Sequence, residues 1–438
     1  MPKCNPSHYR DFTSLDEWLS YLETIHSKEI DLGLSRMNLV ATALAIDLSF
    51  ATVITVAGTN GKGTTCAFIE NALLADNTGN TTNNVAVYSS PHIEHFNERL
   101  RINKQDIDNA SLIEAFKQIE STRGDISLSY YEYTTLAAFI VLMAKKPHYI
   151  ILEVGLGGRL DATNTIDANV AVITTIDLDH QGFLGNDRET IGFEKAGIMR
   201  SNQVIVVGDV IPPKSVLLHA KTLAEDENVY IRNDSFTIED EGIASNSDCW
   251  TWQYKEIAFT GLHSPFIPRD NVATALMVLL TLKINLNTSV INQIIDTTKV
   301  PGRTELFKQE RGCDIVLDVG HNPQATRYLS SYLSKVKTQR SYNKIYAVVA
   351  MLSDKDIANS LVALKDDIDT WYTGQLAVPR AASADLMKET LNSFTHNINC
   401  FDNINEAFRI ANKHANTDDL ILLFGSFFTV AEIRQQLL

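Results

Sequence analysis

Short apolar runs rich in β-branched residues alternate with stretches of helical periodicity, and this alternation limits the possible folds more than any other feature. In the first half the runs cover residues 53–57, 85–88, 149–154, 170–176 and 204–207; three more cover 315–319, 345–351 and 420–424. Runs of this length predict buried strands. Strands that alternate with helices predict a mostly parallel sheet covered by helices, which is the α/β class.

The length of the chain and the changes in composition along it predict more than one domain. At about 150 residues per domain, 438 residues suggest two or three. Residues 230–262 are polar and broken up, and we expect short antiparallel strands attached to the first domain there. Pro301-Gly302 is a strong turn signal, so the junction is placed near it. The predicted division is a first domain of residues 1–298, a linker of 299–305 and a smaller Rossmann-like α/β domain of 306–438.

Composition excludes several classes of protein. The formal net charge of −15 argues against binding nucleic acid through a basic surface. The five cysteines are scattered without a C-x-x-C pair, which is typical of reduced thiols and of neither a disulfide framework nor a zinc site. The longest apolar stretch, residues 136–144, is shorter than the ~20 residues that span a bilayer and predicts a buried helix. The N-terminus lacks a signal-peptide pattern, so a cytoplasmic protein with no membrane partner is expected.

A glycine-rich segment follows the first apolar run and precedes a helical pattern: Gly58-Thr59-Asn60-Gly61-Lys62-Gly63-Thr64-Thr65. Glycines let backbone N–H groups turn toward phosphate oxygens, and the helix that follows offers its positive N-terminus. Lys62 can reach the terminal phosphates, and Thr64 or Thr65 can lie near Mg²⁺. The strict phosphate-loop pattern fails, because Val56 stands where it has glycine and Gly63 follows the lysine. The alternative is an ordinary glycine-rich turn, but the lysine and the strand context favour a nucleotide site in a P-loop ATPase-type domain.

A GTP-binding switch is the non-enzymatic alternative. Residues 103–106 match N-K-x-D, and residues 76–79 and 179–182 match D-x-x-G. Patterns this short arise by chance. The second D-x-x-G follows the N-K-x-D match, which is the wrong order, and the first lies in a polar loop rather than at a strand end. The switch is therefore disfavoured.

Polar side chains stand at the ends of several predicted strands, where open α/β sheets bind ligands. Glu153 closes the run 149–154 ahead of three glycines, and His180 follows the run 170–176. Together they could hold a divalent cation with ATP phosphates and water; the alternatives are a solvated charge and a structural histidine. Ser90 precedes a proline and by spacing alone belongs to a turn. Lys195 lies on a probable helix, and spacing alone predicts a surface lysine.

The order and content of these motifs resemble the folylpolyglutamate synthase family within the Mur ligase superfamily, over nearly the whole chain. The Gly-Leu-Gly-Gly-Arg-Leu-Asp-Ala-Thr-Asn run at 155–164 is the most specific motif. Residues 124–133 look like those of the bacterial bifunctional form, which also has dihydrofolate synthase activity. Further matching segments are Tyr88-Ser89-Ser90-Pro91-His92, Leu178-Asp179-His180, Glu194-Lys195-Ala196-Gly197-Ile198, Pro301-Gly302-Arg303 and Asp318-Val319-Gly320-His321-Asn322-Pro323.

The resemblance implies an ATP-dependent ligase that activates a folate-type carboxylate as an acyl phosphate and joins it to L-glutamate. Its substrates would be ATP, L-glutamate, dihydropteroate and reduced folates, and the protein would be a monomer. Two Mg²⁺ ions are implied, and a monovalent cation is a further candidate whose ligands are not assigned. The implied ATP contacts are Thr59, Asn60, Gly61, Lys62, Gly63, Thr64, Asn271, Arg303 and Asp318. The implied dihydropteroate contacts are Ser129, Tyr130, Tyr131, Glu132, Leu160, Asp161 and Ala162. The implied metal ligands are Ser90, Glu153, His180 and Lys195, the last as a carboxylated lysine, and the implied catalytic residues are Lys62, His180, Lys195 and His321.

Two related enzymes remain as alternatives. One is a folate ligase restricted to polyglutamylation, and the other is a Mur-type ligase that adds an amino acid to a cell-wall precursor. Two positions also depart from the family pattern. Gly182 stands where close members carry an acidic residue, which puts the fine geometry of a metal site in question. Phe428 stands where a histidine is common.

Overall fold

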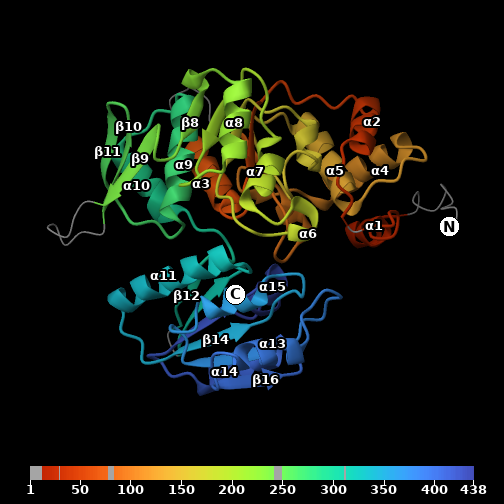
Figure 1. Ribbon diagram of the computed structural model, residues 1–438. Coiled ribbons are helices and arrows are strands. Elements are labelled where there is room, and N and C mark those ends of the chain that lie inside the picture. Colours follow the sequence, from red (N-terminus) through yellow and green to blue (C-terminus); the bar gives the residue numbers. More distant parts are fainter. Residues whose placement is uncertain (1–11, 29, 77–82, 241–248, 310–311) are drawn as a thin grey trace. The chain divides into compact units, whose positions relative to one another are not determined.

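The computed structural model describes residues 12–28, 30–76, 83–240, 249–309 and 312–438 (Figure 1). The chain forms two compact units. The first comprises Met1–Ile176 and Asp187–Thr298, and the second comprises Asp177–Asn186 and Lys299–Leu438. The sequence-based division placed the short segment Asp177–Asn186 in the first domain, whereas the structure groups it with the second unit. None of the helices in the described ranges is long and apolar enough to cross a membrane.

The first unit is built on an eight-stranded sheet with strand order β4-β3-β2-β5-β1-β6-β7-β8. The strands from β2 to β8 in this order pair in parallel, and β3 and β4 add an antiparallel edge. Their bounds are β1 Thr52–Ala57, β2 Val85–Tyr88, β3 Leu100–Ile102, β4 Gln105–Asp106, β5 Tyr149–Glu153, β6 Val170–Ile173, β7 Val204–Val207 and β8 Val229–Ile231. The predicted strands and the mostly parallel sheet are confirmed. The predicted run 170–176 was too long, because Thr174 and Thr175 leave the sheet and bind the phosphate loop through their hydroxyls.

Helices cover this sheet because their apolar sides match its buried strands. Helix α3 packs against β1, β2 and β5 and against α9, which also contacts β7. Another apolar core joins α1, α2, α4 and α5 to the sheet and includes Trp18, Phe116 and Leu152. The predicted buried helix at 136–144 is part of α5. The bounds are α1 Leu15–Leu22, α2 Ser35–Ala43, α3 Lys62–Ala75, α4 Asn109–Thr122, α5 Tyr130–Lys145, α7 Arg188–Ala196, α8 Lys214–Leu223, α9 Arg269–Thr281 and α10 Thr288–Thr297.

The polar stretch after β8 forms the expected antiparallel strands within the first unit. Strands β9 (Phe236–Asp240), β10 (Trp250–Tyr254) and β11 (Ile257–Leu262) make a three-stranded sheet in the order β11-β10-β9 (Figure 1). Trp250 and Trp252 are fully buried, and the Trp252 indole donates to the carbonyl oxygen of Ala273 on α9. The small sheet is therefore anchored to the helix that carries Asn271.

The second unit is a six-stranded sheet with the order β12-β13-β17-β14-β15-β16, parallel except for β12. Its strands are β12 Glu305–Phe307, β13 Asp314–Asp318, β14 Ile345–Val349, β15 Thr370–Gly374, β16 Ile398–Phe401 and β17 Leu420–Phe424. Its helices are α6 Gln181–Leu184, α11 Pro323–Gln339, α12 Ile357–Val362, α13 Ala384–Asn392, α14 Ile404–His414 and α15 Phe427–Arg434. This is the α/β sheet expected for the C-terminal domain, and its core includes Trp371 and Phe424.

Parallel strands bring the loops that follow them to one edge of a sheet. In the first unit, neighbouring strands β2, β5, β1 and β6 end ahead of Ser90, Glu153, the phosphate loop and Thr174. In the second unit, β13, β17 and β14 end ahead of His321, Ser426 and Lys355. Each unit thus gathers its polar candidates at the carboxyl edge of its own sheet.

Candidate active site

The phosphate loop is hydrogen-bonded to the two residues that follow β6. The backbone N–H of Thr59 donates to the carbonyl of Thr175 at 2.6 Å, and the Thr174 hydroxyl donates to the carbonyl of Asn60 at 2.7 Å. A Cβ atom at Gly58 would lie 1.8 Å from the Thr174 hydroxyl oxygen, so only glycine fits there. The loop leads directly into α3, whose first N–H groups have no partners inside the helix. This arrangement suits a phosphate group.

Asn271 on α9 packs against the turn that begins α3. Gly61 is the residue before α3 and has a left-handed φ of 89°. A Cβ atom there would lie 2.5 Å from Asn271 Oδ1, and Asn271 Nδ2 donates to the Thr64 hydroxyl at 2.7 Å. The Thr64 hydroxyl therefore already has a hydrogen-bond partner, whereas the buried hydroxyl of Thr65 has none. The resemblance assigned Asn271 to the ATP site, and the structure places its amide directly against the phosphate loop.

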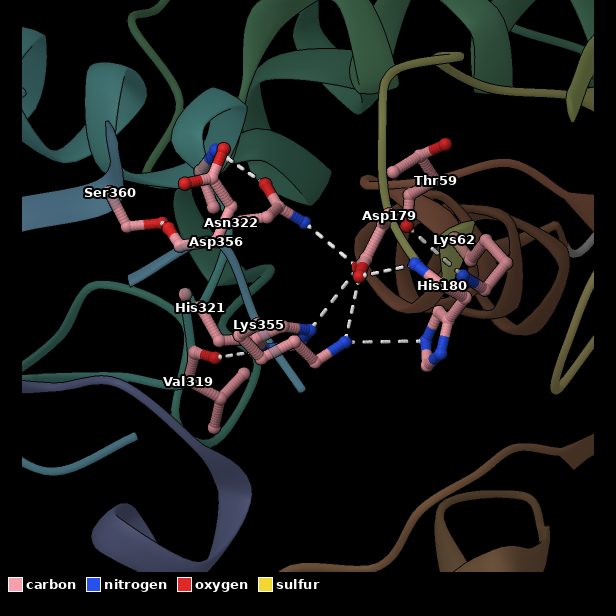
Figure 2. Close-up of polar contacts among 12 residues, drawn as sticks. Thr59, Lys62, Asp179, His180, Val319, His321, Asn322, Lys355, Asp356 and Ser360 are labelled. Atoms are coloured by element: carbon pink, nitrogen blue, oxygen red, sulfur yellow. Dashed lines mark hydrogen bonds and ion pairs between the residues drawn. The ribbon is translucent and has the colours of Figure 1, made fainter. Parts of the chain in front are cut away.

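Two lysines converge on the first carbonyl of the loop. Lys62 Nζ donates to Gly58 O at 3.0 Å. It also donates to Thr59 O at 3.2 Å (Figure 2). Lys195 Nζ donates to the same Gly58 oxygen at 2.9 Å. The prediction from spacing that Lys195 lies on the surface is wrong, because only 4% of it is exposed. Its position in the last turn of α7 directs the side chain inward, which single-sequence periodicity did not reveal.

The first unit also supplies hard oxygen donors beside the loop. Glu153 is buried at the end of β5, and a Cβ atom at Gly63 would lie 3.6 Å from its Oε1. Ser90 follows β2, the strand next to β5, and the Tyr131 ring lies so close to Gly155 that a Cβ there would be 2.7 Å from the Tyr131 hydroxyl. Carboxylate and hydroxyl oxygens next to a phosphate cradle fit Mg²⁺. Across the described ranges, no cluster of three or more His, Cys, Asp and Glu side chains forms a metal site by itself. An ion here would therefore also need phosphate and water oxygens.

The residues expected to contact dihydropteroate at 129–132 form the start of α5. Ser129 and Glu132 make a reciprocal cap, in which Glu132 Oε2 accepts from the Ser129 N–H at 2.7 Å. Glu132 Oε1 accepts from Arg36 at 3.0 Å. Much of the hydrogen-bonding capacity of Ser129 and Glu132 is therefore used to shape the helix start. Tyr130 and Tyr131 are the side chains of this group that offer aromatic faces.

Asp161 organises the glycine-rich run from within. Its carboxylate accepts from the Leu156 N–H at 2.9 Å and from the N–H and hydroxyl of Thr163 at 3.0 and 2.7 Å. It also accepts from the Tyr131 hydroxyl at 3.4 Å. Burial raises the pKa of Asp161, although these hydrogen bonds oppose the shift. Leu160 and Ala162 flank it, so the three residues expected at the pterin site lie on one folded turn.

In the second unit, Asp318 and Arg303 lie at the end of β13. Asp318 accepts from the N–H groups of Thr304 and Gly320 at 2.8 and 2.6 Å. Burial raises the pKa of Asp318, and the charge of Arg303 is the largest opposing influence. The Arg303 guanidinium lies over the Phe427 ring at 5.2 Å. Phe427 and Phe428 begin α15, and Phe428, the departure from the family pattern, is 44% exposed.

Asp179 is the centre of an ion-paired cluster in the second unit (Figure 2). Its carboxylate accepts from Lys355 Nζ at 2.7 Å and from Asn322 Nδ2 at 3.2 Å, and it lies 3.4 Å from His321 Nε2. Burial alone would raise the pKa of Asp179, but His321 and Lys355 together hold it well below its usual range. Lys355 Nζ also lies 3.4 Å from His180 Nε2. Asp179 therefore gathers the second unit's candidate catalytic side chains.

Both ring nitrogens of His321 face oxygen atoms. Nδ1 lies 2.8 Å from the Val319 carbonyl, and Nε2 faces Asp179. Of the expected metal ligands, His180 belongs to the second unit, whereas Ser90, Glu153 and Lys195 belong to the first.

Sequence reasoning missed several residues that the structure brings to these sites. Lys355 follows the predicted strand 345–351, so the strand-end rule that selected Glu153 could have found it. Thr174 and Thr175 likewise follow a strand but carry no charge to attract notice. Arg101 is paired at 2.8 Å with the buried Glu70 of α3 and lies 3.4 Å from the Ser89 hydroxyl. Glu70 lies far from Arg101 in the sequence, and no local pattern indicates that the two side chains pair.

Comparison with known proteins decides the family. The Mur ligase middle domain matches residues 56–282, and the Mur ligase glutamate ligase domain matches residues 302–427. The Escherichia coli (strain K12) dihydrofolate synthase/folylpolyglutamate synthase is 40% identical over 421 residues, which is 96% of this chain and 95% of that protein. The Haemophilus influenzae enzyme of the same name is 39% identical over 95% of this chain and 96% of that protein. This chain belongs to the dihydrofolate synthase/folylpolyglutamate synthase family of Mur ligases.

Solved structures of the family agree with the fold. Escherichia coli FolC in complex with DHPP and ADP has a TM-score of 0.87 at 40% identity and covers 97% of both chains. A bifunctional folylpolyglutamate synthase/dihydrofolate synthase with Mn, AMPPNP and L-glutamate bound has a TM-score of 0.86 at 42% identity, with 97% of this chain and 98% of that one covered. The expected fold class and ligase family are confirmed. The assignment of individual site residues remains a prediction.

Proposed function

We propose that this protein phosphorylates the carboxylate of dihydropteroate or of a reduced folate with ATP and joins it to L-glutamate, which makes dihydrofolate and folylpolyglutamates. Membership of an ATP-dependent ligase family supports the reaction class. The observation that carries the proposal for this chain is the convergence of Lys62, Lys195 and buried Glu153 on the phosphate loop. The relatives named with ADP, DHPP and L-glutamate support the substrates.

The first step transfers a phosphoryl group. The substrate carboxylate attacks the γ-phosphorus of ATP, the bond from that phosphorus to the bridging oxygen breaks, and ADP leaves with the electron pair. Lys62, the loop N–H groups and the N-terminus of α3 oppose the negative charge of the phosphates. Asn271 holds the loop, and Arg303 and Asp318 are proposed to complete the ATP site. The acyl phosphate needs protection from water because it hydrolyses readily.

The second step forms the amide. The α-amine of glutamate attacks the acyl carbon, the carbon–oxygen bond to phosphate breaks, and the amine proton passes to solvent. The family resemblance assigns His321 to the neighbourhood of the reacting centre, and Asp179, which also pairs with Lys355, lies against its ring. The pteroate would lie against Tyr130, Tyr131 and the turn at 160–162, with Ser129 and Glu132 shaping that surface.

Ser90, Glu153, His180 and a carboxylated Lys195 are proposed to hold two Mg²⁺ ions, with a monovalent cation as a further activator. Bound there, Mg²⁺ would neutralise phosphate charge and orient the γ-phosphate. Carboxylation requires the free-base amine of Lys195 to attack the carbon of CO₂. An N–C bond forms, one carbon–oxygen π pair moves onto oxygen, and an amine proton passes to water. The protein is further proposed to act in the cytoplasm as a monomer.

The test uses purified protein with ATP, Mg²⁺ and L-glutamate, with dihydropteroate in one reaction and tetrahydrofolate in another. ADP release and product mass are followed together. We expect ADP and a product one glutamyl residue heavier in both reactions. ADP release with tetrahydrofolate alone would restrict the enzyme to polyglutamylation. Absence of ADP release with either acceptor would contradict the proposal, and turnover of a muramoyl nucleotide instead would point to a cell-wall ligase.

A further inference from the structure

Three residues of the glycine-rich run contact α7 and remain outside the proposed substrate site. They are Gly158, Arg159 and Asn164, on either side of the turn at 160–162. A Cβ atom at Gly158 would lie 2.8 Å from the carbonyl oxygens of both Glu194 and Lys195. The backbone of the run therefore packs directly on the last turn of α7, which is the turn that carries Lys195.

Arg159 fastens the run to the helix at two points. Its backbone N–H donates to the carbonyl oxygen of Glu194 at 2.7 Å, and its guanidinium pairs with the Glu194 carboxylate at 2.8 Å. From the opposite side, a Cβ atom at Gly197 would lie 2.3 Å from the Arg159 Cβ. The last carbonyls of a helix lack partners inside the helix. Arg159 provides a partner for the carbonyl of Glu194 and packs directly against the end of the helix.

Asn164 joins the two segments through one side-chain amide. Its Nδ2 donates to the carbonyl oxygens of Arg159 and Gly197 at 2.9 and 3.0 Å. Its Oδ1 accepts from the Arg200 guanidinium at 3.0 Å, and Arg200 itself donates to Gly197 O at 3.0 Å. Asn164 is only 5% exposed. The carbonyls of Glu194 and Gly197 are thus fixed on both sides of Lys195.

We propose that Asn164 and Arg159 are positioning residues that set the place of the Lys195 amine beside the phosphate loop. Lysine has a long, flexible side chain, so the backbone beneath it must be fixed if its end is to be held for chemistry. The contacts of Arg159 and Asn164 with the backbone of α7 fix the Cα of Lys195. The contact from Lys195 Nζ to Gly58 O shows where the end of the side chain lies. This inference rests on the proposed role of Lys195 at the metal site. It gives the specific Gly155-to-Asn164 motif a second task beyond substrate contact.

The test compares Asn164→Asp with Asn292→Asp. The first keeps shape but replaces the Nδ2 donor with an oxygen that faces two carbonyl oxygens. The control removes a side-chain amide that also bonds to backbone but does not contact α7. Asn292 Nδ2 donates to Gly261 O at 2.9 Å, and its Oδ1 accepts from the His263 N–H at 2.8 Å. For Asn164→Asp we expect kcat to fall about 10–100-fold and the Kd for Mg²⁺, measured by isothermal titration calorimetry in the presence of ADP, to rise by a similar factor. KM for dihydropteroate should change less than about threefold, and Asn292→Asp should move none of these.

Three results would overturn the inference, and they separate it from the proposed function. An inactive wild-type enzyme, or a fully active Lys195→Ala variant, would remove the function or the role of Lys195 on which the inference depends. If the wild-type enzyme is active and Lys195→Ala is not, an Asn164→Asp variant with unchanged kcat and an unchanged Kd for Mg²⁺ would refute the positioning role alone. If Asn164→Asp does not fold, Gly197→Ala disturbs the contact between α7 and Arg159 instead, and the same two readouts decide.

Discussion

The side-chain nitrogen of Lys195 lies 2.9 Å from the carbonyl oxygen of Gly58, the first residue of the phosphate loop. The two residues are 137 positions apart, and the lysine is nearly fully buried. A buried lysine must be paired or chemically used, because an isolated charge is costly away from water. Its place beside a nucleotide loop makes Lys195 the residue whose replacement best tests the mechanism.

Replacement of Lys195 by alanine or arginine should abolish turnover. Alanine removes the amine, and arginine keeps the charge but lacks the primary amine that CO₂ attacks. The expected loss of kcat exceeds the about 10–100-fold typical of residues that only support a metal ligand. ADP release with saturating Mg²⁺ is the measurement. Lys221→Arg, at an exposed lysine of α8, is the control and should retain full activity; near-normal turnover of Lys195→Arg would exclude the carbamate.

Gly61→Ala should weaken use of ATP. Gly61 has a φ of 89°, and its Cβ would lie 2.5 Å from Asn271 Oδ1, so the variant combines backbone strain with a clash. A fall of at least about tenfold in kcat/KM for ATP is expected, equivalent to about 1.4 kcal/mol of transition-state stabilisation. Gly261→Ala is matched for left-handed backbone, at φ 67°, but meets nothing within 4 Å. If both variants lose ATP use equally, the contact with Asn271 does not matter.

Glu120→Ala should destabilise the first unit strongly. Glu120 is buried and accepts from Tyr21 at 2.9 Å, from Tyr133 at 3.1 Å and from Arg123 Nε at 2.8 Å. Removal of one partner of a buried ion pair typically costs about 3–5 kcal/mol, since the other charge is left uncompensated. Urea unfolding measures the loss. Glu114→Ala, at an exposed position of the same helix, should change stability by less than about 0.5 kcal/mol; equal effects would mean that the pairing contributes nothing.

Acid should destabilise the protein partly through His92. Burial and then the charge of Arg99 lower the pKa of His92 to about 4, and its Nδ1 accepts from Arg99 Nε at 2.9 Å. The unfolded histidine has a pKa near 6.5. Between about pH 6.5 and 4 the unfolded chain therefore binds the extra proton, so the free energy of unfolding falls as the pH falls through this window. His92→Gln should show a smaller loss between pH 7 and pH 5 by urea unfolding; an identical loss in both proteins would contradict the shift.

Much of the first unit could be predicted from the sequence because its signals are local. The alternation of buried strands with helices predicted the α/β class, and the position of Glu153 at a strand end predicted its place at the sheet edge. The strand at 170–176 was predicted too long because an apolar, β-branched run does not show that Thr174 and Thr175 turn out to hold the phosphate loop. Resemblance supplied Asn271 and Lys195, which spacing did not select.

The sequence by itself determined the strand pattern, the nucleotide loop and, through the Gly155-to-Asn164 run, the family. Those features depend on residues that are close together in the sequence, so they can be recognised without knowing which distant residues are in contact. Only the tertiary structure decided that Lys195 is buried, that Asn164 ties the glycine-rich run to its helix, and that Lys355 pairs with Asp179 across 176 positions of sequence. These facts depend on which distant segments the fold brings together. A charged side chain looks the same in a sequence whether it faces water or a buried partner.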